Sequence, residues 1–345
     1  MSERRMKKHM PRDILSRMDC QIRVYQEKIQ DSGEDALLYA MNNRAVLVGA
    51  FDGCGGAGAK RYPKLQGKTG AYMASRVVCG TVNDWFNDCC ARNAGFSAES
   101  LADRIRENLA VCDRMGGESS RFVSSMVKAF PTTAALAVLT DQEGEIRVDC
   151  FWAGDSRVYL LNAEGLAQLS VDDLLVTDAL ENLYEDGAMT NVISHSKPFT
   201  IHHGSLILDQ PGIVFAATDG CFGYLPTPMA FEQLLVNTLV RSENVEQWEK
   251  TLHSVIGRVA GDDYALSAAA LDFGSFAAMK ACFARRAKFL QEYYPPELAK
   301  EREDKNRMWA QYKPGYCRLQ LGGKGNFPKE SGRFEDFTGK QNPIA

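Results

Sequence analysis

Short apolar segments rich in β-branched and aromatic residues recur along most of the chain, separated by turn sequences. Segments of this kind predict β-strands. The turns TDQEGE and NAEG join consecutive segments at hairpin distance, which favours antiparallel pairing over β-α-β crossovers. The predicted strands are residues 21–26, 44–51, 134–140, 146–154, 157–162 and 212–218, with 264–271 as a weaker, alanine-rich candidate.

Other stretches show helical periodicity, with apolar residues at three- and four-residue steps. They predict helices at about 69–92, 98–115, 228–241 and 244–260. Strands and helices therefore come in blocks, a pattern typical of the α+β class. We expect a four-layer α/β/β/α sandwich, in which two antiparallel sheets pack face to face and helices cover the outside.

The chain changes character near residue 274. Beyond it, FAAMKACFARRAKFLQEYY is expected to form an amphipathic helix, and PPELAKEREDKNRMWAQY a second helix started by its prolines. A loose Gly/Lys tail follows. We therefore divide the chain into a basic, flexible N-terminus (1–18), a main domain (19–274) and a helical C-terminal extension (275–345).

Composition narrows the functional class. The 345 residues are 45% hydrophobic, with a net charge of −4 and a pI near 5.8, so nucleic acid is not an expected partner. No apolar run approaches 20 residues, so we expect no association with a membrane. The sequence shows no secretory signal, so we expect a cytoplasmic location. The ten cysteines include no C-x-x-C pair, which argues against a disulfide scaffold or a zinc module.

Acidic residues beside glycine flank four of the apolar strands. Asp52, Asp155 and Asp219 stand where a strand stops, and Asp262 and Asp263 stand just before a strand starts. An isolated Asp-Gly is usually only a turn. Four such placements on apolar strands suggest instead that the acids converge.

Converging carboxylates repel one another unless a cation neutralises them. Oxygen ligands without His or Cys at metal spacing select hard cations such as Mg²⁺ or Mn²⁺. Two such ions can bridge one water and direct it in line at phosphorus. The acidic residues therefore suggest metal-dependent phosphoester hydrolysis.

Five motifs appear in a fixed order: FDGCGG, PTTAALAV, WAGDSRVYLL, ATDGCFGYL and GDDYALSAAAL, with SGEDALL upstream. This set resembles the metal-dependent protein phosphatases of the PPM type (type 2C serine/threonine phosphatases), and the chain looks like a bacterial member. The resemblance covers about residues 20–272. It implies a β-sandwich flanked by helices, with a binuclear metal centre at one edge.

The resemblance also implies metal-binding roles. Asp52 matches the aspartate that bridges both metals, and the carbonyl of Gly53 matches a backbone ligand. Asp219 and Asp262 match the other carboxylates of the two sites. These three aspartates are the expected catalytic centre.

Three further acids match the family at neighbouring positions. Glu34 matches a glutamate that holds a metal-bound water. Asp155 matches the residue that, with Asp219, forms a third and weaker metal site in many members. Asp263 is expected to orient the site rather than to bind metal.

The sequence departs from the family pattern at the residue after Asp-Gly. Many eukaryotic members have a histidine there, proposed as the acid that protonates the leaving group, and this chain has Cys54. Two interpretations remain open for Cys54, a compact side chain that packs in a crowded turn or a redox-sensitive catalytic thiol.

A second departure concerns the substrate phosphate. The arginine that the family usually carries before EDA is missing, which leaves Lys28 or Gln30 as the candidate phosphate-binding residues. The loop after the metal motif is longer than usual. Its cations form either a rim over the site or a solvated loop; they are Lys60, Arg61, Lys64 and Lys68.

The residues after LSVDD resemble the family's flap, an element that usually shapes substrate choice. The leading interpretation is a Mg²⁺- or Mn²⁺-dependent phosphatase for phosphoserine or phosphothreonine in proteins, with two ions per site. The alternative is a catalytically weak relative that binds a partner, such as a cognate Ser/Thr kinase, through the loop and the C-terminal helices. A phosphatase that is specific for a small phosphorylated metabolite is a third interpretation.

Overall fold

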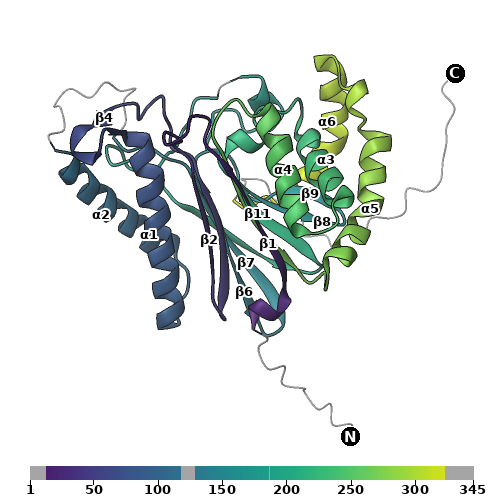
Figure 1. Ribbon diagram of the computed structural model, residues 1–345, viewed down its shortest axis with the longest axis horizontal. Helices are drawn as coiled ribbons and strands as arrows, with labels where there is room; N and C mark the ends of the chain where they lie inside the picture. Colours follow the sequence, from purple (N-terminus) through teal and green to yellow (C-terminus); the bar gives the residue numbers. More distant parts are fainter. Residues whose placement is uncertain (1–12, 118–128, 186, 323–345) are drawn as a thin grey trace, which may run out of the picture.

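The predicted sandwich of two antiparallel sheets is confirmed by the computed structural model of the protein, which describes residues 13–117, 129–185 and 187–322 (Figure 1). Most of the predicted basic N-terminus, up to residue 12, and the predicted tail from residue 323 lie outside the described residues.

The first sheet has the strand order β10-β7-β6-β3-β2, with every neighbouring pair antiparallel. The turn between β6 and β7 places Glu143 and Gly144 at φ values of 58° and 96°, as a tight hairpin requires. The strands are β2 (Ala36–Met41), β3 (Ala45–Phe51), β6 (Ala134–Gln142), β7 (Glu145–Ala153) and β10 (His202–Leu208).

The second sheet has the order β1-β12-β11-β8-β9. Its strand β12, the alanine-rich candidate of the sequence, lies between β1 and β11, and all of its residues are buried. Alanine suits this place because small side chains let layers pack closely on both faces. The strands are β1 (Met18–Gln26), β8 (Arg157–Asn162), β9 (Gly165–Gln168), β11 (Gly212–Ala217) and β12 (Tyr264–Leu271).

Successive side chains of a strand enter two different cores. In β11, Ile213 and Phe215 pack toward the helices, whereas Val214 and Ala216 pack against the first sheet. Because both faces of the strand are covered, the sequence of β11 is continuously apolar instead of alternating.

Helices form the two outer layers, as Figure 1 shows. α1 (Gly70–Arg92) and α2 (Ala98–Gly116) cover the first sheet. α3 (Pro228–Arg241), α4 (Val245–Val259), α5 (Phe276–Tyr293) and α6 (Arg302–Tyr316) lie on the second. In the described part of the chain, no helix is both long and apolar enough to cross a membrane.

The helix boundaries correct one prediction. α6 begins at Arg302 and not at the prolines, because Pro296–Leu298 forms a separate 3-10 turn, η5. Five of the described strands were not predicted: β2, β9, β10 and the two short strands β4 and β5. The long loop after the Asp52 motif contains two short paired strands, β4 (Arg61–Tyr62) and β5 (Lys68–Thr69), with the 3-10 turn η2 (Pro63–Leu65) between them.

Candidate metal centre

The ends of five strands meet at one edge of the sandwich. In the first sheet, Ala36 pairs with Phe51, so the start of β2 lies beside the end of β3. In the second sheet, Ala217 pairs with both Leu266 and Arg157, so the end of β11 lies beside the starts of β12 and β8. The residues just outside these strands are therefore brought to one edge; they include Glu34, Asp35, Asp52, Asp155, Asp219, Asp262 and Asp263.

Asp52 and Asp35 form a buried pair at the centre of this edge. Their carboxyl groups lie within hydrogen-bonding distance of each other, and Thr218 Oγ1 donates to Asp35 Oδ2 at 2.7 Å. Burial, followed by repulsion from neighbouring carboxylates, raises both pKa values well above their ordinary range. In the metal-free protein, burial and mutual repulsion therefore favour the protonated form at this pair.

Asp155 and Asp219 lie beside this pair. Burial raises the pKa of Asp155 to about 7, and the nearby charges of Asp219 and Asp172 add to the effect. Asp219 also raises the pKa of Asp52 and of Asp35. Among the described residues, the buried oxygen Asp155 Oδ1 has no hydrogen-bond partner. This cluster thus holds more negative charge than its described partners neutralise.

The glycines of the two Asp-Gly motifs permit this convergence. A Cβ on Gly53 would lie 2.6 Å from the carbonyl oxygen of Ala71 and 2.7 Å from that of Glu34. A Cβ on Gly220 would lie 1.9 Å from the carbonyl oxygen of Asp263. Only glycine lets these backbone segments approach so closely.

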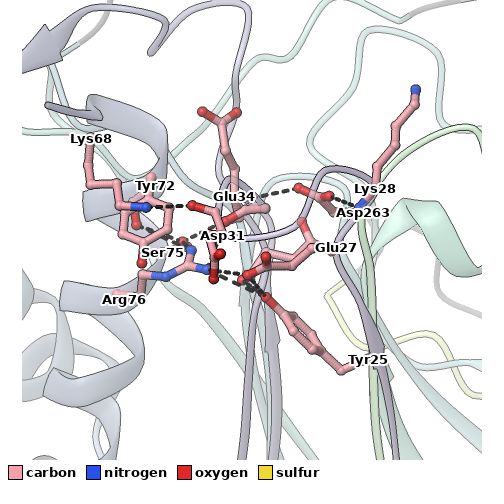
Figure 2. Close-up of polar contacts among 12 residues, drawn as sticks. Tyr25, Glu27, Lys28, Asp31, Glu34, Lys68, Tyr72, Ser75, Arg76 and Asp263 are labelled. Carbon is pink, nitrogen blue, oxygen red and sulfur yellow. Dashed lines mark hydrogen bonds and ion pairs between the residues drawn. The ribbon is translucent and has the colours of Figure 1, made fainter.

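Asp263 ties the loop between β1 and β2 to the start of β12, as Figure 2 shows. Its carboxylate accepts the backbone N–H of Lys28 at 2.7 Å and that of Glu34 at 2.6 Å. From α1, Arg76 donates to the carbonyl of Gly33 at 2.7 Å, and its guanidinium stacks 3.7 Å from the ring centre of Tyr72. The loop that carries Glu34 and Asp35 is therefore held from both sides.

Glu34 and Asp262 lie toward the solvent side of the cluster. Glu34 Oε1 accepts a hydrogen bond from Thr69. Burial raises the pKa of Glu34, Asp263 and Asp262 raise it further, and Arg61 opposes them. Asp262 is exposed, and its Oδ1 accepts the backbone N–H of Asp263 at 2.9 Å.

The predicted phosphate-binding residues lie on the surface of the same loop. Lys28 and Gln30 are both exposed. Lys28 Nζ donates to the carbonyl of Gly261, and its side chain extends away from Glu34 in Figure 2. Cys54 is half-buried in the turn after Asp52, where its backbone N–H donates to the carbonyl of Pro131 at 3.2 Å.

Sequence reasoning missed Asp35, Thr218 and Arg76. Asp35 is the most buried acid of the edge, with 3% of its surface exposed. A signal was present, because Asp35 directly precedes an apolar segment, as Asp263 does. The partner Thr218 gave no such signal, since it stands 183 residues away along the chain.

The donor chemistry of the edge fits a hard divalent cation. The converging groups are carboxylates, with oxygen donors alone, and Asp155 carries an unsatisfied buried oxygen. Within the described ranges, no three or more His, Cys, Asp or Glu side chains are already arranged as a ligand set. Binding of a cation by Asp52 would therefore require this carboxyl group to be deprotonated.

Comparisons with known proteins agree with this fold. A sequence profile described as Protein phosphatase 2C matches residues 26–256. No curated protein matches the sequence. Solved structures that share the fold include serine/threonine phosphatase Stp1 from Staphylococcus aureus (17% identity, TM-score 0.56, covering 79% of this chain and 100% of that one). They also include a bacterial serine phosphatase (16%, 0.53, 74% and 98%) and the serine/threonine phosphatase PstP/Ppp from Mycobacterium tuberculosis (14%, 0.51, 73% and 98%).

Proposed function

The chain belongs to the protein phosphatase 2C family and is a phosphoprotein phosphatase, and on that premise we propose that it hydrolyses phosphoserine and phosphothreonine in proteins with two Mn²⁺ or Mg²⁺ ions. One observation supports this above all. Acids from both sheets gather at one edge of the sandwich, where their repulsion and burial raise their pKa values. Such a cluster is favourable only when cations or protons neutralise it.

We assign the two ions to Asp52, the carbonyl of Gly53, Asp219 and Asp262. Cations held there would supply a water activated for in-line attack on phosphorus. Asp35 acts through Asp52, because its buried carboxyl group lies against that of Asp52 at the end of β3 and raises the pKa of Asp52. Thr218 in turn fixes Asp35.

Two acids extend the site. The unsatisfied oxygen of Asp155, beside Asp219, supports its assignment to a third and weaker cation. Glu34 is assigned to a water in contact with an ion, since its carboxylate is fixed by Thr69 and repelled by Asp262 and Asp263. Asp263 orients the loop and is not a ligand in this proposal.

Three residues are assigned to the substrate side. Lys28 and Gln30 remain the proposed phosphate-binding residues, because they are exposed on the loop that also carries Glu34. Arg61 lowers the pKa of Glu34 and is exposed on the long loop, which supports a similar role.

Cys54 is proposed as a packing residue of the turn that follows Asp52. The substitution Cys54→Ser tests this, since it keeps the size of the side chain and weakens its acidity. Turnover that stays within about threefold of the wild type supports packing, and a loss of about 100-fold supports a catalytic thiol.

The test of the function is hydrolysis of p-nitrophenyl phosphate and of a phosphothreonine peptide with Mn²⁺, with Mg²⁺ and with EDTA. We expect metal-dependent turnover that Asp219→Asn lowers by about 100-fold or more. The matched control is Asp209→Asn. Asp209 is an exposed acid ten residues before Asp219, outside the acidic edge, so this variant should retain activity. A folded protein that neither turns over substrate nor binds Mn²⁺ in calorimetry would overturn the proposal.

A further inference from the structure

Helix α6 is hydrogen-bonded to the segment that follows β9 through one carboxylate of that segment, Asp178. We define the flap segment as residues 174–185, the first part of the flap-like stretch after LSVDD. Within it, Asp178 accepts hydrogen bonds from Trp309 Nε1, at 3.0 Å to each carboxylate oxygen, and from Lys313 Nζ at 2.8 Å. Burial raises the pKa of Asp178, but the bonds from Lys313 and Trp309 outweigh it, so the pKa lies below its ordinary value.

A second set of contacts joins the first turn of α6 to the same segment. Arg302 donates to Glu181 Oε2 at 2.7 Å, and its guanidinium lies 4.7 Å from the ring centre of Tyr184. Lys305 Nζ lies 5.7 Å from that ring. Cations along α6 therefore face acids and an aromatic ring along the flap segment.

Asp178 also builds the turn that it anchors. Its Oδ1 accepts the backbone N–H groups of Leu180 at 2.9 Å and Glu181 at 3.1 Å. These bonds cap the short 3-10 turn η3 (Glu181–Leu183). One carboxylate thus carries both the shape of the turn and its attachment to α6.

This turn forms one wall of a pocket of about 430 Å³ beside the acidic edge. Asn182, Leu183 and Tyr184 line the pocket on the flap side, and Asp155 and Asp219 line it too. In the described part of the chain, Asn182 Oδ1 and Tyr184 Oη are buried without a hydrogen-bond partner. Buried polar atoms of this kind call for a ligand, because leaving them unsatisfied is costly.

Helix α6 is itself fixed to the core by hydrogen bonds. Tyr316 Oη lies 3.2 Å from Tyr159 Oη and accepts from Arg157 at 3.3 Å. Tyr312 Oη donates to the buried Glu232 at 2.5 Å. α6 is therefore a firm support for the flap segment.

We propose that α6, which lies beyond the matched residues 26–256, positions the flap segment against the metal centre and thereby sets the affinity for phosphorylated protein substrates. Asp178 and Lys313 are positioning residues in this arrangement, since they act through the turn that they hold. The proposal rests on the proposed phosphatase function. It adds to that function that α6 holds the flap segment, which forms the wall of the pocket that faces the substrate.

The experiment compares Lys313→Ala with Arg307→Ala in the full-length protein. Both remove an exposed cation from α6, but among the described residues Arg307 pairs only with Asp304 of the same helix. Two readouts are taken: hydrogen exchange of the amides of residues 179–185, and KM and kcat for a phosphothreonine peptide and for p-nitrophenyl phosphate. Asp178→Ala and the conservative variant Lys313→Arg complete the series.

In Lys313→Ala we expect exchange in residues 179–185 to become roughly tenfold faster and the KM for the peptide to rise roughly threefold to tenfold. Asp178→Ala should show larger changes, Lys313→Arg should restore both values, and Arg307→Ala should match the wild type. Because p-nitrophenyl phosphate has no peptide chain for the flap segment to bind, its kinetic constants should stay within about twofold.

Unchanged hydrogen exchange in both Lys313→Ala and Asp178→Ala would overturn the claim that α6 positions the flap segment. Faster exchange with an unchanged peptide KM would overturn the role in substrate affinity. If the wild type hydrolyses neither substrate, the proposed function fails, and hydrogen exchange still decides whether α6 positions the flap segment.

Discussion

The carboxyl groups of Asp35 and Asp52 are hydrogen-bonded to each other across the start of β2 and the end of β3. Two carboxyl groups can share such a bond only while one of them keeps its proton. A cation bound by Asp52 must displace that proton, because metal ligands bind in their deprotonated form. Stability, pH and metal binding are therefore coupled at this pair.

The metal-free protein should lose stability as the pH rises from about 4 to about 7. An unfolded aspartate has a pKa of about 3.9, whereas in the fold the pKa of Asp155 is about 7 and those of Asp35 and Asp52 are raised well above the ordinary value. Over this window the folded state binds more protons than the unfolded state. The free energy of unfolding therefore falls with rising pH.

Added Mn²⁺ should counter this loss, and its stabilising effect should be larger where the acids are charged. We expect the melting temperature to rise by about 4 °C or more with Mn²⁺ at about pH 8, and by much less at about pH 5. Scanning calorimetry with and without the metal measures both shifts. Equal shifts at the two pH values would contradict the coupling, and Asp155→Asn should weaken the pH trend of the metal-free protein.

Gly220→Ala should disrupt the meeting of β11 and β12. The added Cβ would lie 1.9 Å from the carbonyl oxygen of Asp263, and neither backbone segment can retreat easily. We expect a loss of about 2–4 kcal/mol in the free energy of unfolding, measured by urea denaturation. Gly56→Ala is the matched control, because nothing lies within 4 Å of its Cβ. An equal effect of the two substitutions would refute the close approach.

Thr218→Val should destabilise the protein through Asp35. The hydroxyl donates to Asp35 at 2.7 Å and accepts the backbone N–H of Ala265 at 2.9 Å, and valine can do neither. Leaving two buried groups unpaired should cost about 1–3 kcal/mol. Thr218→Ser keeps the hydroxyl and should cost less than about 1.5 kcal/mol. Denaturation curves that place the two variants together would show that the hydrogen bonds are unimportant.

Arg157 neutralises Asp172 beside the metal centre. The pair is buried, with 2.6 Å between Arg157 Nη2 and Asp172 Oδ2. Arg157→Met should cost about 3–5 kcal/mol, because it leaves the carboxylate of Asp172 uncompensated, and Asp172→Leu added to it should recover part of the loss. Urea denaturation of the two single variants and the double variant forms the thermodynamic cycle. Additive losses would show that the pair is not coupled.

Local patterns were enough to predict most of the sandwich. The apolar segments that became β3, β6, β7, β8 and β11 carry their signal in their own residues, and the Asp-Gly motifs mark where Asp52 and Asp219 stand. Strand β12 looked weak because alanine has low strand propensity. Packing between two layers overrides that propensity, and no local pattern reveals it.

The rest of the site depends on distant contacts. Thr218 lies 183 residues from Asp35, and Asp263 lies 235 residues from Lys28, so neither pairing leaves a mark in a short window of sequence. The start of α6 was misplaced for a similar reason. Pro296–Leu298 turns on its own, and the helix begins where Arg302 can reach Glu181.

Deletion of residues 302–345 should produce an unstable, aggregating protein. This deletion removes α6, whose Met308, Trp309, Tyr312 and Tyr316 are at most 9% exposed in the core on the second sheet. Losing the burial of four such side chains removes roughly 6–12 kcal/mol, which is comparable to the whole stability of a typical domain. It also strips Glu232 of the hydrogen bond from Tyr312. Soluble yield and light scattering report the outcome.

The matched control is deletion of residues 323–345, which removes none of the described contacts and should leave the melting temperature within about 2 °C. The contrast also decides what the C-terminal aromatic residues are for. If they pack inward, as their burial indicates, only the longer deletion aggregates. A soluble, cooperatively melting protein without residues 302–345 would mean that α6 is dispensable for folding, and its aromatic face would then be available to a partner such as a cognate kinase.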